Sequence, residues 1–272
     1  MEYFQCDLSG ADGWTVAAHC KRLGDATMFD DYLYGIKPAN VIALMYQFGK
    51  AVGDMPRADL KLAAKKVDKE GWLYFASKVI QHGTNYLMGP NLVSSVILKR
   101  SYKELGDAIF VSPTECKKLQ SLYQEGRYKG IKLWHKDCET QLITKGRLKG
   151  ASGHTRVFLG RRKSGGKVDH QTLGEFVADE PQENTTYATN LAMYNLSSDS
   201  DNRRPNGGYI IEPLHQVHDA LNGQYPQRIR DWAHKKIKSY FENPMQIAGM
   251  TITIPYEGNC GPSWGELPYK LE

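Results

Sequence analysis

The chain has 272 residues, a mass of 30.7 kDa and a formal net charge of +5. Its 41% hydrophobic and 24% charged residues are ordinary for a globular protein, with enough chain for one large domain or two lobes sharing a core. Five cysteines without a CxxC pair argue against a disulfide framework or a zinc site, and no signal peptide or membrane-spanning apolar run is present. We therefore expect a soluble, cytoplasmic protein, whose positive charge favours an anionic partner without establishing one.

The first clear pattern lies at the N-terminus. Residues 3–8 alternate around Asp7, which is typical of a strand with one buried face. A Ser-Gly pair ends this run, and residues 14–20 predict the start of a helix, with Asp12 in the link between the two. We therefore expect a strand that presents a carboxylate close to its end.

Residues 25–144 are mainly helical in pattern. Apolar residues repeat at helical spacing within residues 25–49 after Pro38, and residues 112–138 predict two further helices. Lys37 directly precedes Pro38 and is either a phosphate ligand or a solvated lysine.

Residues 72–98 form the most informative helical stretch. Lys78, His82 and Tyr86 are four residues apart, so a helix places them along one face. A cation, an imidazole and a phenol in one row suit a nucleoside triphosphate, with the cation at the phosphates. The alternative is an ordinary amphipathic helix that carries these residues by chance.

Residues 145–167 are basic, rich in glycine and free of acidic residues. Their apolar centre, residues 157–159, predicts a strand. We expect a hairpin in which basic residues such as Lys149 and Arg156 follow a phosphate backbone, although a solvated face is the alternative. The basic residues are Lys145, Arg147, Lys149, Arg156, Arg161, Arg162, Lys163 and Lys167.

The C-terminal part of the chain predicts a mixture of elements. We expect a helix over residues 185–196, a mobile polar loop over 198–207, a basic amphipathic helix over 226–241 and a closing strand over 250–255.

Residues 208–225 read as a hairpin with His218 and Asp219 at its bend, where the second run ends at an Asn-Gly pair. A lone acidic residue in a turn is usually only a solvated turn former. Together with Asp7 it suggests a two-metal phosphoryl-transfer site, because hard divalent ions prefer carboxylate oxygen from more than one direction.

These segments resemble three motifs of the DNA polymerase I family, also called family A, and most closely its phage members. Residues 7–12 (DLSGAD) resemble motif A, Asp-x-Ser-x-x-Glu. Residues 78–86 match the fingers motif Lys-x3-aromatic-x3-Tyr, with histidine in place of the aromatic residue, and residues 216–219 (QVHD) match motif C. Weaker similarities are Gln182, at the family's helix-borne glutamine, and Ser263-Trp264, near its C-terminal end.

The resemblance implies that Asp7 and Asp219 bind two Mg²⁺ ions, with Mn²⁺ as a substitute, and that the backbone carbonyl of Leu8 completes one coordination shell. Catalysis would also involve Lys78, which would neutralise the dNTP triphosphate and protonate the leaving pyrophosphate. Asp12 would replace the family's glutamate that excludes the ribonucleotide 2′-hydroxyl.

Further contacts follow from the same resemblance. His82 and Tyr86 would lie against the incoming nucleotide, and Gln182 and His218 would contact the primer terminus in the minor groove.

The chain departs from the family pattern at several positions. Tyr74 replaces an arginine that binds the triphosphate, so Lys37 is a candidate substitute. Leu87 replaces the glycine after the tyrosine, and Ala220 replaces the acidic residue often found after the motif C aspartate. Asp12 is shorter than glutamate, which would loosen sugar discrimination. None of these changes removes a predicted metal ligand.

The fold class implied is α/β, with an antiparallel palm sheet that carries motifs A and C and a mostly helical fingers insertion. We expect palm in residues 1–24, fingers in 25–144 and palm again in 145–272. Motif A begins close to Met1, so we expect the thumb and exonuclease domains on a separate chain and an exposed interface at residues 1–6.

The function implied is template-directed DNA synthesis on primer-template DNA, by the C-terminal part of a split or truncated enzyme in a phage-infected bacterial cytoplasm. A phage-type single-subunit RNA polymerase fragment shares both aspartates and the Lys-Tyr helix, but an acidic residue at position 12 favours deoxynucleotides. A non-catalytic DNA-binding accessory chain has no need of paired carboxylates. A metal-dependent nuclease has no need of the row formed by Lys78, His82 and Tyr86.

Overall fold

The computed structural model describes residues 1–160 and 168–271, and the chain forms two compact units. The first unit consists of Met1–Thr15, Lys149–Thr155 and Glu180–Glu272, and the second of Val16–Leu148 and Arg156–Asp179. The palm and fingers boundaries expected from the sequence stay a prediction. None of the helices in the described part of the chain combines the length and hydropathy needed to cross a membrane.

The first unit is built on a five-stranded sheet in which neighbouring strands are antiparallel. This sheet carries Asp7 in a strand and Asp219 in a turn, so the predicted fold class, α/β with an antiparallel sheet that presents both aspartates, is confirmed. In spatial order the strands are β4 (Glu212–Val217), β5 (Ala220–Tyr225), β1 (Glu2–Leu8), β8 (Tyr256–Gly261) and β9 (Tyr269–Lys270).

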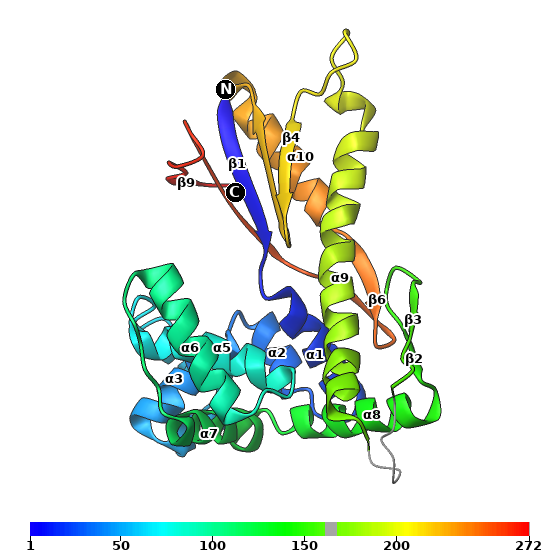
Figure 1. The fold of residues 1–272 in the computed structure, drawn as a ribbon. Coiled ribbons are helices and arrows are strands. Elements are labelled where there is room, and N and C mark those ends of the chain that lie inside the picture. Colours follow the sequence, from blue (N-terminus) through cyan, green and yellow to red (C-terminus); the bar gives the residue numbers. More distant parts are fainter. Residues whose placement is uncertain (161–167, 272) are drawn as a thin grey trace. The chain divides into compact units, whose positions relative to one another are not determined.

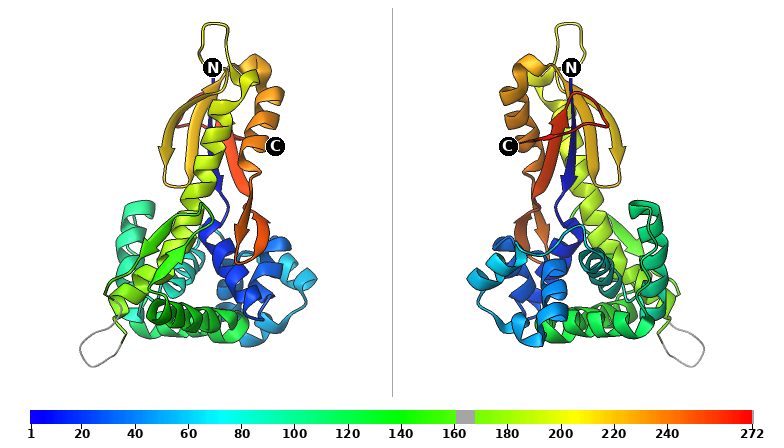
Figure 2. Two further views of the ribbon diagram at one scale, coloured as in Figure 1. Left: turned by 90° about the vertical axis from the view of Figure 1, so that its right-hand side faces the viewer. Right: turned by 90° about the vertical axis from the view of Figure 1, so that its left-hand side faces the viewer.

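Strand β1 lies in the interior of this sheet, between β5 and β8 (Figure 2, blue between gold and red). Phe4, Cys6 and Leu8 are buried on one face, whereas Asp7 points to the exposed face. Because both edges of β1 are paired within the chain, the expected exposed interface at residues 1–6 is wrong. The strand that covers the second edge, β8, is remote in sequence and was not predicted as part of the sheet.

The predicted hairpin around Asp219 is present, but its second strand is longer than expected. β5 continues past the Asn-Gly pair to Tyr225. A Cβ at Gly223 would lie 2.5 Å from both the Phe4 ring and the carbonyl oxygen of Glu212. The glycine therefore allows close packing within the strand instead of ending it.

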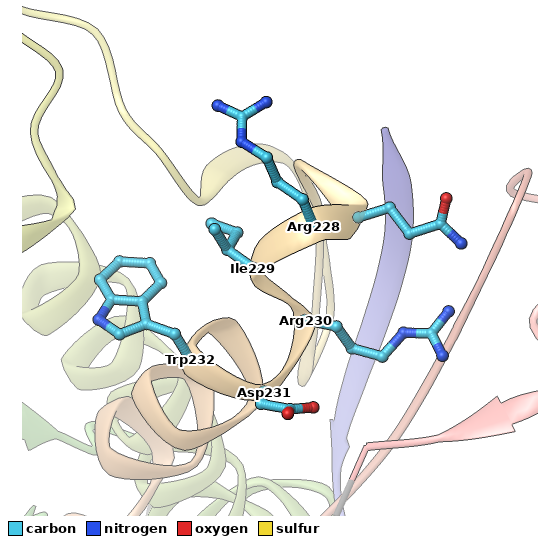
Figure 3. Close-up of a pocket in the computed structure, with 6 residues that line it drawn as sticks. Arg228, Ile229, Arg230, Asp231 and Trp232 are labelled. Atoms are coloured by element: carbon cyan, nitrogen blue, oxygen red, sulfur yellow. The ribbon is translucent and has the colours of Figure 1, made fainter.

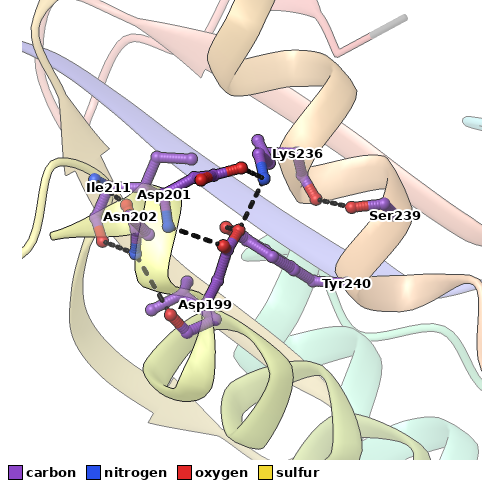
Figure 4. Close-up of polar contacts among 8 residues, drawn as sticks. Asp199, Asp201, Asn202, Ile211, Lys236, Ser239 and Tyr240 are labelled. Carbon is purple, nitrogen blue, oxygen red and sulfur yellow. Dashed lines mark hydrogen bonds and ion pairs between the residues drawn. The ribbon is translucent and has the colours of Figure 1, made fainter.

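Two helices in the first unit are joined by a polar network (Figure 4). Beyond the end of α9 (His170–Ser198), the Asp199 carboxylate accepts hydrogen bonds from Lys236 Nζ at 2.8 Å and from the Tyr240 hydroxyl at 2.6 Å, both on α10 (Arg230–Phe241). Asn202 is fully buried and makes three hydrogen bonds to the backbone. The prediction of a mobile loop over residues 198–207 is therefore wrong for the first half of this segment, because these contacts hold it in place.

The strand expected over residues 250–255 exists but has another partner. β7 (Met250–Thr253) pairs with β6 (Pro244–Ile247) in a separate two-stranded hairpin. The next strand, β8, joins the main sheet between β1 and β9.

The second unit is mainly helical, as the sequence predicts. Helix starts follow known rules: Pro38 occupies the first turn of its helix, and Ser112 and Glu115 form a capping box at theirs. The helices, apart from α9, are α1 (Ala11–Arg22, shared with the first unit), α2 (Thr27–Leu33), α3 (Pro38–Phe48), α4 (Arg57–Ala64), α5 (Trp72–Asn85), α6 (Pro90–Leu105), α7 (Pro113–Ser121) and α8 (Gly130–Thr144), with a 3-10 turn at Lys50–Asp54 and a π-helical turn at Leu122–Arg127.

A buried ion pair lies at the centre of the second unit. The Asp31 side chain has no solvent exposure and accepts hydrogen bonds from Arg127 Nε at 2.6 Å and from Arg57 Nε at 3.0 Å. Arg127 Nη2 donates a third at 2.8 Å, and the Tyr128 hydroxyl donates a fourth at 3.0 Å. Buried charge is tolerated only when it is paired in this way, so these contacts connect α2 to α4 and to the π-helical turn.

Helix α9 is much longer than the predicted run of residues 185–196 (Figure 1). It begins at His170 and continues through Pro181, and the boundary between the two units falls just before that proline. A proline normally ends a helix, which is why the sequence favoured a later start.

Candidate active site

The two predicted metal-binding aspartates lie on the same sheet. In the register of β1, Asp7 is paired with Ala220 of β5 on one side and with Glu257 of β8 on the other. Asp219 directly precedes Ala220 in a two-residue turn that is closed by the pair Val217 and Ala220. The turn therefore brings the second carboxyl group next to the first.

The two carboxyl groups interact directly. The pKa of Asp7 is raised from 3.8 to about 6, first by partial desolvation and then by the charge of Asp219 and a hydrogen bond with its carboxyl group. Glu257 adds a smaller repulsion, and the Leu8 backbone opposes the shift by hydrogen bonding. A site with this much negative charge favours a cation.

The turn that carries Asp219 is strained. His218 has φ of 52°, one of three non-glycine residues with positive φ in the described part of the chain. Hairpin turns of two residues usually have glycine or asparagine where φ is positive. His218 is exposed at the tip of the hairpin, and its predicted primer contact stays a prediction.

Helix α9 contacts both aspartate-bearing segments within one helical turn. Thr185 Oγ1 donates a hydrogen bond to Asp12 Oδ1 at 2.7 Å. Four residues later, Thr189 Oγ1 lies 3.4 Å from the carbonyl oxygen of Asp219. Neither threonine was predicted, because only the spacing of four residues marks them and their partners are remote in sequence.

Glu257 was also missed. It lies in register with Asp7, and its Oε1 accepts a hydrogen bond of 2.7 Å from Ser9 Oγ in the motif A segment. The clear alternation lies in residues 250–255, before β8, and no local pattern marks Glu257.

The candidate metal ligands in the described part of the site are few. Within residues 1–160 and 168–271, no group of three or more His, Cys, Asp or Glu side chains has a metal-binding arrangement. Two carboxylates and the carbonyl of Leu8 remain the candidate ligands. Gln182 lies on an exposed position of α9, and its carbonyl oxygen accepts a hydrogen bond from Thr186.

The predicted nucleotide-binding residues lie on α5 in the second unit. Lys78 and His82 are exposed, whereas Tyr86 is buried and directly follows the end of the helix. The His82 and Tyr86 rings are perpendicular, with centroids 4.6 Å apart. Leu87 has φ of 60°, the left-handed conformation that the family's glycine would adopt without strain. A helix is present as expected, but the stretch over residues 72–98 is divided into α5 and α6, and Tyr86 lies outside the helix that carries Lys78 and His82. The contacts of these residues with a nucleotide stay a prediction.

The predicted phosphate-binding residues have different surroundings. Lys37 is exposed and precedes the first residue of α3. Lys149 is exposed in β2 (Arg147–Lys149), which pairs with β3 (Thr155–Val157). Arg156 is paired with Asp179 at 2.8 Å and Glu175 at 3.4 Å, so α9 supplies the counter-charge that the basic segment lacks. The remaining basic residues near the end of this segment lie outside the described residues. They are Arg161, Arg162, Lys163 and Lys167.

The expected strand core of the basic segment is only partly correct. Phe158 is buried, but Val157 and Leu159 are 62% and 87% exposed. The strand ends at Val157.

One shallow pocket has none of the predicted site residues in its lining. It has a volume of about 630 Å³ and is lined by residues 227–232 at the start of α10 (Figure 3). Arg230 and Trp232 point in opposite directions there, and Arg230 is paired with the buried Glu2. We assign no role to this pocket.

The architecture described above is similar to that of a domain of a known DNA polymerase. The chain is similar in structure to the POL domain of Pol1 from M. smegmatis, solved in complex with a DNA primer-template and dNTP, with a TM-score of 0.69 and 17% sequence identity. The similarity covers 97% of this chain and 40% of that chain. The predicted resemblance to the DNA polymerase I family is thereby confirmed at the level of the fold. No family model matches the sequence, and no curated protein matches it either.

Proposed function

We propose that this protein catalyses template-directed DNA synthesis, by transfer of a nucleotide from dNTP to the 3′-hydroxyl of a primer. The observation that carries this proposal is the contact between Asp7 and Asp219, on adjacent segments of an antiparallel sheet with a polymerase fold. Two carboxylates held together in this way need a cation, and a polymerase needs cations at the reacting phosphate.

Asp7, Asp219 and the carbonyl of Leu8 fit two Mg²⁺ ions, with Mn²⁺ as a substitute. Their donors are all oxygen, which hard cations prefer, and a cation would relieve the repulsion that raises the pKa of Asp7. When bound, such ions activate the primer hydroxyl and neutralise charge on the leaving pyrophosphate.

The remaining residues act on the nucleotide and on DNA. Lys78 neutralises the triphosphate and gives a proton to the pyrophosphate, supported by its exposure on α5. His82 and Tyr86 lie against the nucleotide. Lys37 takes the role of the triphosphate-binding arginine that the family has and this chain lacks. Asp12 restricts the space for a 2′-hydroxyl.

DNA contacts come from both exposed and paired residues. Gln182 and His218 contact the primer terminus, and Lys149 contacts the backbone. Arg156 first has to exchange its carboxylate partners for phosphate.

The context of the activity forms part of the proposal. The chain spans 40% of the length of the polymerase chain to which it is similar. We assign residues 1–24 and 145–272 to the palm and 25–144 to the fingers, and place thumb and exonuclease functions on a separate, phage-encoded chain. Since a thumb grips duplex DNA, this chain alone should bind primer-template weakly, and a thumb-bearing partner should increase that affinity.

Single-nucleotide primer extension with Mg²⁺ tests the function. The intact chain and Asp219→Asn are compared with dNTP and rNTP, with and without a thumb-bearing partner chain. Template-directed dNTP addition that is lost in the variant is expected. Equal use of rNTP would favour the RNA polymerase alternative, and DNA binding without any addition, with the partner present, would favour the accessory alternative. Degradation of the primer would favour the nuclease.

A further inference from the structure

The contact between Thr185 and Asp12 has no counterpart among the predicted roles. Asp12 lies in the first turn of α1, where a negative charge is stabilised by the helix dipole. Its Oδ1 accepts the 2.7 Å hydrogen bond from Thr185 Oγ1, and both residues belong to the first unit. Hydrogen bonds to a charged acceptor are about twice as strong as neutral ones, so this contact restricts the side chain of Asp12.

The position of Thr185 relative to α1 is itself fixed. The neighbouring Asn184 is fully buried, and its Nδ2 lies 3.3 Å from Thr15 Oγ1 while its Oδ1 accepts from the backbone of Ala151 at 2.9 Å. Thr15 is one turn after Asp12 on α1. Two polar contacts therefore set the register between α9 and the start of α1.

Thr185 has a second acceptor close by. Its Oγ1 lies 2.9 Å from the carbonyl oxygen of Pro181, one turn earlier on α9. A hydroxyl group has one proton and donates it to one acceptor at a time. The closer, charged Asp12 is the better acceptor, and Pro181 satisfies the hydroxyl group when Asp12 moves, so release of Asp12 leaves no unsatisfied donor.

We infer that Thr185 is a positioning residue for sugar discrimination: its hydrogen bond holds Asp12 where the carboxylate opposes a 2′-hydroxyl. This inference rests on the proposed function, in which Asp12 lies beside the sugar of the incoming nucleotide. Asp12 has one methylene fewer than glutamate, so it reaches less far. A fixed orientation is then needed to keep it effective.

The test compares Thr185→Val, which removes the hydroxyl group at nearly constant volume, with Thr185→Ser, which keeps it. Thr186→Val is the matched control, because the hydroxyl group of Thr186 bonds only the carbonyl of Gln182 among the contacts that the structure gives it. The readout is kcat/KM for dNTP divided by kcat/KM for rNTP. We expect Thr185→Val to lower this ratio about tenfold, the effect of one hydrogen bond to a charged group, while Thr185→Ser and Thr186→Val retain it.

A double-mutant cycle separates positioning from a general loss of structure. In an Asp12→Ala background, Thr185→Val should leave the ratio unchanged, because the group it positions is absent. The preference for dNTP over rNTP is also measured as the ratio of their binding affinities for a complex with a dideoxy-terminated primer. This measurement requires no chemical step. An unchanged ratio in Thr185→Val, or an equal loss for both nucleotides, overturns the inference while the function stands. A wild-type chain that neither extends primers nor binds nucleotides, with the partner chain present, overturns both.

Discussion

Asp219→Asn should make the metal-free protein more stable while abolishing its activity. Asp7 and Asp219 repel each other when both are ionised, and this contributes to the rise in the pKa of Asp7 from 3.8 to about 6. If the whole rise in the pKa of Asp7, about 2 pH units, acted on folding, it would lower the free energy of unfolding by about 3 kcal/mol. Asp7 is exposed and desolvation is the largest cause of its shift, so we expect a gain of only about 1 kcal/mol. The melting temperature should rise by about 3 °C.

The pH dependence of this gain has a definite sign. The folded state binds the Asp7 proton more tightly than the unfolded chain, so the contribution of Asp7 to wild-type stability falls as the pH rises from 3.8 to about 6. The deficit is complete at pH 7. The difference between Asp219→Asn and wild type should therefore be largest at neutral pH and should close in acid.

Thermal denaturation in EDTA and then in Mg²⁺ measures both effects. Mg²⁺ should stabilise the wild type, by about 1.4 kcal/mol at ten times its dissociation constant, and should stabilise Asp219→Asn much less. Asp107→Asn, at an exposed aspartate outside the helices, is the control for a simple change in net charge. If Asp219→Asn is no more stable than wild type in EDTA at pH 7, or gains as much from Mg²⁺, the two carboxylates do not form a shared cation site.

Three further variants test other parts of the structure. His218→Gly should raise the free energy of unfolding by about 1 kcal/mol, since glycine adopts positive φ without strain, while primer extension falls; a denaturation curve that shifts downward contradicts the strained turn. Asp31→Asn should lower the free energy of unfolding by about 3 kcal/mol, because it leaves the buried charge of Arg127 uncompensated, and urea denaturation measures this loss. Lys78→Ala should lower kcat about 100-fold with an unchanged melting temperature, as expected if this exposed lysine acts as a general acid. Lys78→Arg keeps the positive charge and should recover part of the lost kcat. Single-turnover kinetics distinguish a slower chemical step from weaker nucleotide binding.

The sequence predicted those parts of the site whose signals are local. Alternation identified β1, and two apolar runs around His218 and Asp219 identified the hairpin, because the period of a strand can be read within a few residues. Helix α5 followed in the same way from spacing at intervals of four. These elements carry all three predicted catalytic residues, Asp7, Asp219 and Lys78.

Features that depend on remote partners were not predictable in the same way. The register that places Glu257 beside Asp7 arises only when β8 joins the sheet. The basic segment around Arg156 looked free of counter-charge, but its partners, Glu175 and Asp179, lie on α9. Polar composition suggested mobility near Asn202, whereas burial with three backbone hydrogen bonds has the opposite effect.

The turn between β4 and β5 argues for catalysis and against a purely structural role. A hairpin selected for stability alone would have glycine at the first position of this bend, where φ is positive. This chain instead has His218 in a left-handed conformation and Asp219 against a second carboxyl group, two unfavourable features in adjacent residues. Contacts from α9 hold the turn and the start of α1 in place despite them. Strain and like-charge repulsion in adjacent residues of one turn are typical of a site arranged to bind cations and substrate.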